Sequence, residues 1–326
     1  MTKRMPRTLG PWSYVSLILA CAALAFFFPF GNWRDAKIMT MASTTSSPIY
    51  MTGTSVLKHI SACDSDQRHV TQMMAARLGS QVTDLSYGGQ TLIEQAAYLG
   101  TAMHNPQARV LIASASLGDF TPTSEPAFRR RLLFTLASPP SQVRYASDDV
   151  ADLVMGRDLP ESFDYDGEHF ASYDYIKQKY LSVEREHSTC PETQGYDHRF
   201  VKAIYYGNYV VRPIDDAAVA LMARTAAQAR AHGKQFFLVV MPVDMELVKQ
   251  LDPAWVNAIQ ALRDRLVARL GTQGVSVLDL SEQVPDAGFA DRWCACGHLQ
   301  SLGRERTADR LADELRQRVD WLQQHH

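Results

Sequence analysis

Strand and helix patterns alternate along two stretches of this chain, and this alternation constrains the fold most. Short apolar segments of strand length are separated by longer segments in which apolar residues recur at helical spacing. The expected strands are residues 49–54, 81–86, 109–115, 236–241 and 275–280. The expected helices are residues 70–78, 92–103, 216–232, 254–270 and 301–322. This order predicts a parallel sheet of about five strands, covered on both faces in a three-layer α/β/α sandwich.

The alternation stops between residues 121 and 213. This stretch is rich in proline, aspartate and tyrosine, and eight of the thirteen tyrosines of the chain lie between Tyr165 and Tyr209. It contains no strand–helix repeat, so we expect an insertion of mixed, partly helical segments and loops. Its aromatic side chains could serve ordinary packing, or contact with a glycan or a protein partner.

The N-terminal residues predict a membrane anchor. No charged residue lies between Thr8 and Trp33, and three basic residues precede this run. A run of this length spans a bilayer as one helix, and the basic residues place the N-terminus in the cytoplasm. We therefore expect a single-pass protein of the inner (cytoplasmic) membrane whose main domain is periplasmic or otherwise extracytoplasmic. The alternatives are a signal peptide with its cleavage site at Ala25 and a loose lipoprotein motif at Cys21.

The overall composition excludes two other classes. Hydrophobic residues make up 46% of the 326 residues, which is enough for a sizeable core and argues against a disordered chain. The formal net charge of −2 gives no electrostatic argument for nucleic-acid binding. The expected organisation is a cytoplasmic tip and anchor at 1–34, a linker at 35–47, and an α/β domain at 48–326 with the insertion at about 121–213.

Four of the five cysteines would lie outside the cytoplasm, where disulfides persist. They are Cys63, Cys190, Cys294 and Cys296, and they allow three pairings. A bond between Cys294 and Cys296 would close a very tight ring, so we expect at least one of these two to pair with Cys63 or Cys190. The alternative is a metal site in the Cys-Ala-Cys-Gly-His segment. Its cysteine spacing is shorter than zinc sites use and no second ligand pair is evident, so no metal is expected.

A serine and a histidine follow strands near the two ends of the chain. Ser55 follows the first strand in a Gly-Thr-Ser turn, and His298 follows the last strand by a loop and opens the final helix. In parallel α/β sheets, ligands bind at the C-terminal ends of the strands. A serine hydroxyl becomes a nucleophile when a histidine takes its proton, and backbone N–H groups at Ser55 and at Gly88 or Gly89 could bind the oxyanion. The pattern therefore predicts acyl transfer.

These motifs resemble those of the SGNH (GDSL-type) hydrolase superfamily. The resemblance covers about residues 48–120 and 216–320, with the middle unmatched. It implies an SGNH-like fold, a catalytic Ser55 and His298, and no cofactor. It also implies an oxyanion or substrate-binding role for the glycines of the second block and for the residues of the third. The matching positions are Gly53-Thr54-Ser55, Gly88 or Gly89, Gly118-Asp119, and the segment from His298 to Gly303.

Two positions depart from the pattern of that superfamily. Its acid normally precedes the histidine by three residues, and Ala295 stands there; Asp291 is the nearest acid, so it is the candidate for the third member of the triad. Otherwise the site is a Ser–His dyad, or a backbone carbonyl orients the histidine. The asparagine of the third block is also missing, and Ser116 or Asp119 occupies its neighbourhood. An aspartate there would accept a hydrogen bond where an oxyanion needs a donor.

The anchor and the insertion resemble a narrower group, the membrane-anchored proteins of the DltD and alginate O-acetylation (AlgJ-like) type. That resemblance implies a partner, a multispanning membrane-bound O-acyltransferase, and an acceptor, a cell-envelope polysaccharide. We therefore expect an O-acyltransferase component that moves an acyl group onto this polysaccharide through a serine acyl-enzyme. The expected acyl group is acetyl. The alternatives are a tethered carbohydrate esterase or deacetylase with the same catalytic residues, and a non-catalytic scaffold for a membrane partner.

Overall fold

The computed structural model describes most of the α/β domain. The described residues are 33–60, 64–121, 163–165, 168–170, 201–202, 205–210, 213–290, 292 and 297–323. The chain divides into two compact units. One contains Met1–Lys37 and Pro126–Gly156, of which only Trp33–Lys37 are described; the other contains Ile38–Glu125 and Arg157–His326 and carries the main sheet.

The main sheet has five strands, and every pair of neighbours is parallel. The order across the sheet is β2-β1-β3-β6-β7. The bounds are β1 Ile49–Thr52, β2 Val82–Asp84, β3 Val110–Ala115, β6 Gln235–Val240 and β7 Ser276–Asp279. All residues of β1 and β3 are buried. This agrees with their nearly continuous apolar sequences, since strands covered on both faces expose neither side. The predicted parallel sheet is confirmed.

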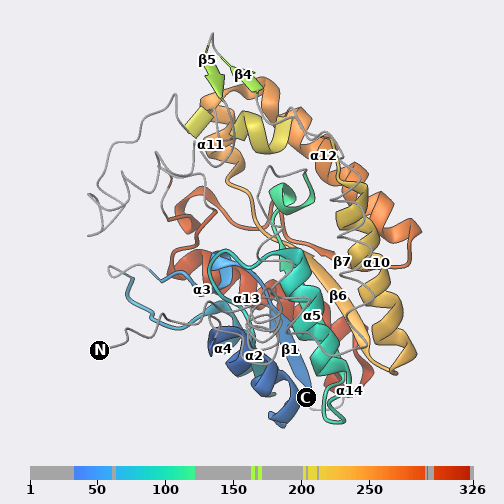
Figure 1. The fold of residues 1–326 in the computed structure, drawn as a ribbon. Coiled ribbons are helices and arrows are strands. Elements are labelled where there is room, and N and C mark those ends of the chain that lie inside the picture. The colour runs from blue at the N-terminus through green and yellow to red at the C-terminus, as the bar shows by residue number, and fades with distance from the viewer. Residues whose placement is uncertain are drawn as a thin grey trace, which may run out of the picture. The chain divides into compact units, whose positions relative to one another are not determined.

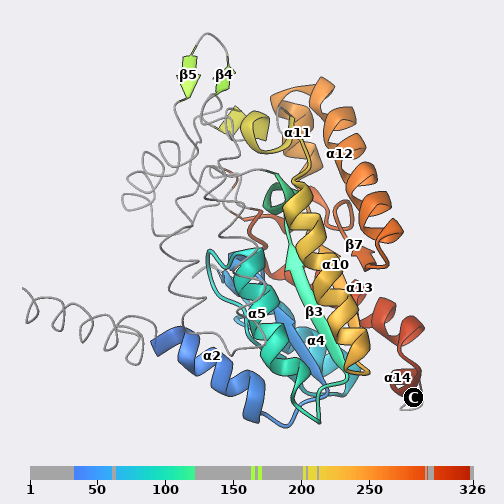
Figure 2. The same cartoon turned by 45° about the vertical axis from the view of Figure 1, so that its right-hand side comes forward.

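Helices cover both faces of this sheet, as Figures 1 and 2 show. On one face, α4 (Val70–Leu78) packs against α13 (Ser301–Arg318), and both contribute to one apolar core with the strands. On the other face lie α5 (Leu92–Met103), α10 (Asp216–Ala231) and α12 (Pro253–Thr272). The expected final helix ends early: α13 is capped at Val319, and the short α14 (Asp320–Gln323) follows.

A helix occupies most of the expected linker at 35–47. Helix α2 spans Trp33–Thr44, and its residues Ile38 and Ala42 are buried. The side-chain amide of Asn105 donates to backbone carbonyls at and just after the C-terminal end of this helix, including those of Ala42 (3.2 Å) and Thr45 (3.0 Å). Residues 38–47 are therefore fastened to the α/β unit. Among the residues that the structure describes, no helix is long and apolar enough to cross a membrane. The predicted anchor lies outside them.

The described parts of the insertion are short. Strands β4 (Phe163–Tyr165) and β5 (Glu168–Phe170) form an antiparallel pair, and η3 (Tyr206–Val210) is a π-helical turn. Tyr205 and Tyr209 are buried, and the ring of Tyr206 lies 5.7 Å from that of Trp255 in α12. In this part of the insertion the tyrosines pack against the α/β unit, so they do not form an open aromatic platform.

Candidate active site

The turn after β1 presents Ser55. The strand ends at Thr52, and α3 (Ser55–Lys58) begins after Thr54, whose side chain accepts a hydrogen bond from the N–H of Val56. Gly53 has to be a glycine for steric reasons. A Cβ there would overlap the hydroxyl of Ser114 in β3 and lie 2.6 Å from Cδ1 of Leu57. This close approach fixes the path of the chain immediately before the nucleophile candidate.

Two buried glutamines hold the same turn, and the sequence analysis missed both. Gln90 accepts a hydrogen bond from the N–H of Gly53 (2.6 Å) and donates to the carbonyl of Leu85 (2.9 Å). Gln95 accepts a hydrogen bond from the hydroxyl of Thr52 at the end of β1 (3.2 Å) and donates to the carbonyl of Ser114 (2.9 Å). The amides connect the loop after β2, α5 and β3 to the end of β1, so the backbone around residues 52–54 is rigidly placed.

His298 lies on a segment that folds back on the chain before it. The N–H of Ala290 donates to the carbonyl of His298 (2.8 Å), and the N–H of Gln300 donates to the carbonyl of Gly288 (2.9 Å). Gly303 reinforces this arrangement, because a Cβ there would overlap the carbonyl oxygen of Gly288. The glycine at the end of the His-Leu-Gln-Ser-Leu-Gly segment therefore has a packing role.

The structure brings the two predicted catalytic side chains together. Nε2 of His298 lies 3.0 Å from Oγ of Ser55, although 243 positions separate the residues in the sequence. His298 is 9% exposed and Ser55 is partly exposed. A neutral imidazole with its proton on Nδ1 accepts the serine proton in this geometry, which is the requirement for activating the hydroxyl.

A buried ion pair fastens the histidine segment to the serine segment. Arg304 in α13 is fully buried and donates to Oδ2 of Asp64 at 2.6 Å; the other oxygen of Asp64 accepts from the N–H of Ser301 at 3.0 Å. Arg304 also donates to the carbonyl of Leu299, next to His298, and to that of Arg68. The pair thus connects the start of α13 to the loop that precedes α4.

The predicted oxyanion glycines differ in their placement. Gly88 is beside the nucleophile, because a Cβ on it would lie 3.8 Å from Cβ of Ser55. The N–H of Tyr87 donates to the carbonyl of Gly53 at 3.1 Å and holds this loop along the Ser55 turn. Gly89 has φ of +74°, so it serves the turn itself. Gly88 is therefore the better placed of the two candidate donors.

Asp119 has a local structural contact that the sequence did not reveal. Gly118 and Asp119 belong to the 3-10 turn η1 (Leu117–Phe120), and Oδ2 of Asp119 accepts from the N–H (2.7 Å) and the hydroxyl (3.1 Å) of Ser116. A Cβ on Gly118 would lie 3.5 Å from Cε1 of Tyr209. The turn is therefore capped by Asp119 and packed against the end of the insertion. At this position the sequence has an aspartate that accepts hydrogen bonds, whereas an oxyanion would need a donor.

The pKa of Asp119 gives a testable pH effect. Burial raises this pKa from 3.8 to about 6, against the two hydrogen bonds that lower it. The folded protein then binds more protons than the unfolded chain between about pH 4 and 6, so Asp119 reduces stability as the pH rises through this range. As the pH rises from 4 to 7.5, the free energy of unfolding of Asp119→Asn is expected to increase by about 1–3 kcal/mol relative to that of the wild type. Urea unfolding at several pH values measures this difference, with exposed Asp264→Asn as the charge control. Equal changes in the two variants would contradict it.

Several predicted residues lie outside the described part of the chain. They are Asp291 and the cysteines Cys63, Cys190, Cys294 and Cys296. The residue after Asp291, Arg292, is described, and it is ion-paired with the buried Asp244 after β6 (3.0 Å) and with Asp286. This fastens the start of the loop that leads to His298. Among the described residues, no group of three or more His, Cys, Asp or Glu side chains is arranged to hold a metal ion.

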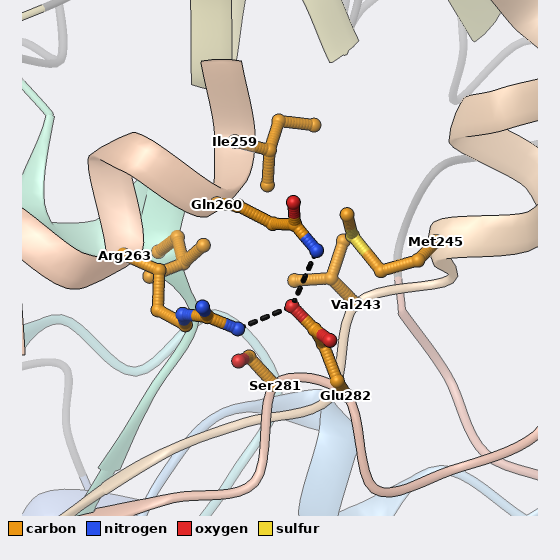
Figure 3. A pocket seen from close by; sticks show the side chains of 8 residues that line it. Val243, Met245, Ile259, Gln260, Arg263, Ser281 and Glu282 are labelled. Atoms are coloured by element: carbon orange, nitrogen blue, oxygen red, sulfur yellow. Dashed lines mark hydrogen bonds and ion pairs between the residues drawn. The ribbon is translucent and has the colours of Figure 1, made fainter. Parts of the chain in front are cut away.

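A small hollow between the β6 and β7 ends and α12 is a separate feature (Figure 3). It encloses about 150 Å³, including space open to solvent. Glu282 in its wall accepts a hydrogen bond from Gln260 at 3.0 Å and pairs with Arg263. These polar groups are bonded to one another, and neither Ser55 nor His298 lines the hollow. We assign it no ligand.

A second histidine, His59, lies beside His298, and it was not among the residues predicted for the site. The ring of His59 is stacked on that of His298, with 4.1 Å between ring centroids and 7° between ring planes. His59 ends α3, and its N–H donates to the carbonyl of Ser55 at 2.6 Å. The only signal in the sequence is its position four residues after the serine, one helical turn away.

Comparison with protein-family models gave no match, and neither did comparison with curated proteins. Solved structures that resemble the chain include SGNH hydrolases and esterases. One is a protein from Slackia heliotrinireducens assigned to the SGNH hydrolases, with 14% identity, 82% of this chain and 98% of that chain covered, and a TM-score of 0.40. Another is an acetyl xylan esterase from the rumen bacterium Butyrivibrio proteoclasticus, with 12% identity, coverage of 85% and 66%, and a TM-score of 0.36. A third is an aryl esterase of M. smegmatis, with 10% identity, coverage of 82% and 98%, and a TM-score of 0.37. At these identities and TM-scores, we base no functional conclusion on them.

Proposed function

We propose that this chain is a serine-dependent acyl-transfer enzyme of the SGNH type, with Ser55 as nucleophile and His298 as base. The observation that carries the proposal is the 3.0 Å approach of His298 Nε2 to Ser55 Oγ at the C-terminal edge of a parallel sheet. Ser55 Oγ attacks the acyl carbonyl while Nε2 takes its proton, and Nε2 then protonates the departing alcohol. The product is an acyl-enzyme ester on Ser55.

The groups that would stabilise the oxyanion are backbone amides. The N–H of Ser55 belongs to the nucleophile residue, and Gly88 lies against Ser55 without a side chain to block approach. Such fixed donors act on the charge that develops on the carbonyl oxygen in the transition state. In the second half of the reaction, an acceptor hydroxyl gives its proton to His298 and attacks the ester carbonyl. The bond between the acyl carbon and Ser55 Oγ then breaks, and His298 returns the proton to Oγ, which leaves the acyl group on the acceptor.

We further propose that the acceptor is a hydroxyl of a cell-envelope polysaccharide and that the acyl group is acetyl. The apolar N-terminal run favours a membrane-anchored protein with its active site outside the cytoplasm. A multispanning membrane-bound O-acyltransferase is then the proposed partner and acyl source. Hydrolysis, with water as the acceptor, uses the same two side chains and is the alternative.

The test separates these acceptors. Full-length protein purified in detergent is incubated with an activated acetyl ester, with and without an oligosaccharide, and the products are identified by mass spectrometry. Acetylated sugar is expected. Free acetate alone would favour the esterase. Failure of a serine-reactive phosphonate to label Ser55, together with no turnover, would favour a non-catalytic scaffold. Co-purification with a multispanning acyltransferase tests the partner independently.

A further inference from the structure

His59, whose ring stacks on that of His298, takes no direct part in the proton transfer between Ser55 and His298. His59 leaves α3 one turn after Ser55, and the hydrogen bond from its N–H to the Ser55 carbonyl makes the two residues one rigid unit. Its ring is nearly parallel to the ring of His298, with 7° between the planes. Rings in this arrangement are in van der Waals contact over their faces.

The catalytic distance depends on the plane of the His298 ring. The terminal torsion of a histidine side chain has broad minima, so torsional preference alone does not fix the direction of Nε2. A ring packed flat against it does, because rotation of His298 would drive its edge into His59. His59 cannot replace the triad acid, since a stacked ring accepts no in-plane hydrogen bond from Nδ1.

The stack also bears on charge. When Ser55 gives its proton to Nε2, His298 becomes an imidazolium. In its uncharged state, the His59 ring presents an aromatic face that attracts this cation. The cationic side chain of α3 is Lys58, and its ammonium is ion-paired with Asp84 at 2.8 Å. The ring face of His59 is thus the part of this turn that the structure places against the base.

We propose that His59 is a positioning residue for the base: by parallel stacking it holds the ring plane of His298 and stabilises the imidazolium formed when Ser55 loses its proton. This inference rests on the proposed acyl-transfer function. It requires a flat aromatic ring at position 59, whereas it does not require the histidine nitrogens. Phenylalanine should therefore substitute for His59, and leucine, of similar bulk but without a ring, should not.

The experiment compares His59→Phe, His59→Leu and His59→Ala in the full-length protein. Steady-state kinetics are measured with p-nitrophenyl acetate, and thermal unfolding reports folding. We expect kcat to fall about tenfold in the Leu and Ala variants with KM nearly unchanged, and to stay within about threefold of wild type in the Phe variant. His104→Ala is the matched control, because His104 forms a ring pair with His232 outside the site; its kinetics should not change.

The outcomes separate this inference from the function on which it rests. Suppose that Ser55→Ala abolishes turnover, while His59→Leu and His59→Ala keep kcat within twofold of wild type. This result overturns the role of His59 and leaves the proposed function standing. A tenfold loss in the Phe variant also overturns it, even if the Leu and Ala variants fail to fold. Turnover that persists in Ser55→Ala overturns the proposed function itself.

Discussion

Replacing Ser55 with alanine is expected to lower acetyl-ester turnover by at least about a thousandfold while leaving the protein folded. The loss follows from the geometry, because Oγ of Ser55 is the atom that His298 Nε2 approaches at 3.0 Å. Alanine removes one partly exposed hydroxyl and keeps the backbone of the turn. The change in the free energy of unfolding should therefore stay within about 1 kcal/mol. If the acceptor is the envelope polysaccharide that we propose, the same change should also abolish its acetylation in cells.

The measurement combines steady-state kinetics, urea unfolding and the acetyl content of the purified polymer. His298→Ala should give a loss of similar size, and the double variant should be hardly slower than either single one, because the two groups act as a unit. Ser43→Ala, at an exposed serine on α2, is the control. A Ser55→Ala enzyme that retains a tenth of wild-type turnover would show that another group is the nucleophile.

The sheet could be predicted from the sequence because its central strands are nearly continuous apolar runs. Strand β3 is buried at all six positions, and such a segment reads as a strand without any tertiary information. Helix α2 could not be predicted in the same way. Its position depends on Asn105, whose amide binds the carbonyls at its end from 60 or more positions away. The end of helix α13 at Val319 could not be predicted either, because neither glycine nor proline lies there.

The residues of the candidate site show the same difference: some could be predicted from the sequence and others could not. Ser55 and His298 were predictable because each follows a strand, and parallel strands bring their C-terminal ends to one edge. The residues that support them were not. Gln90 and Arg304 are polar residue types that usually face solvent, and only their partners make them buried. His59 acquires its contact with His298 only when the two ends of the chain meet.

Replacing Arg304 with methionine is expected to lower the free energy of unfolding by about 3–5 kcal/mol. The guanidinium and its partner Asp64 are both buried, with side-chain exposures of 0% and 2%. Methionine keeps much of the volume but leaves the Asp64 carboxylate buried beside an apolar group. This cost is a large part of the 5–15 kcal/mol that stabilises a typical domain. Urea unfolding of the full-length protein in detergent measures it.

Two control variants separate the effect of breaking the buried ion pair from the effect of removing one positive charge. Arg306→Met, on an exposed face of the same helix, should change stability by no more than about 0.5 kcal/mol. Arg304→Met combined with Asp64→Leu should recover part of the loss, because removing both charges leaves none unpaired. Asp64 also binds the N–H of Ser301, so recovery should be incomplete. If Arg304→Met is as stable as wild type, the ion pair does not fasten α13 to the loop before α4. The backbone bonds of residues 288–290 with 298–300 would then have to hold His298 at Ser55 by themselves.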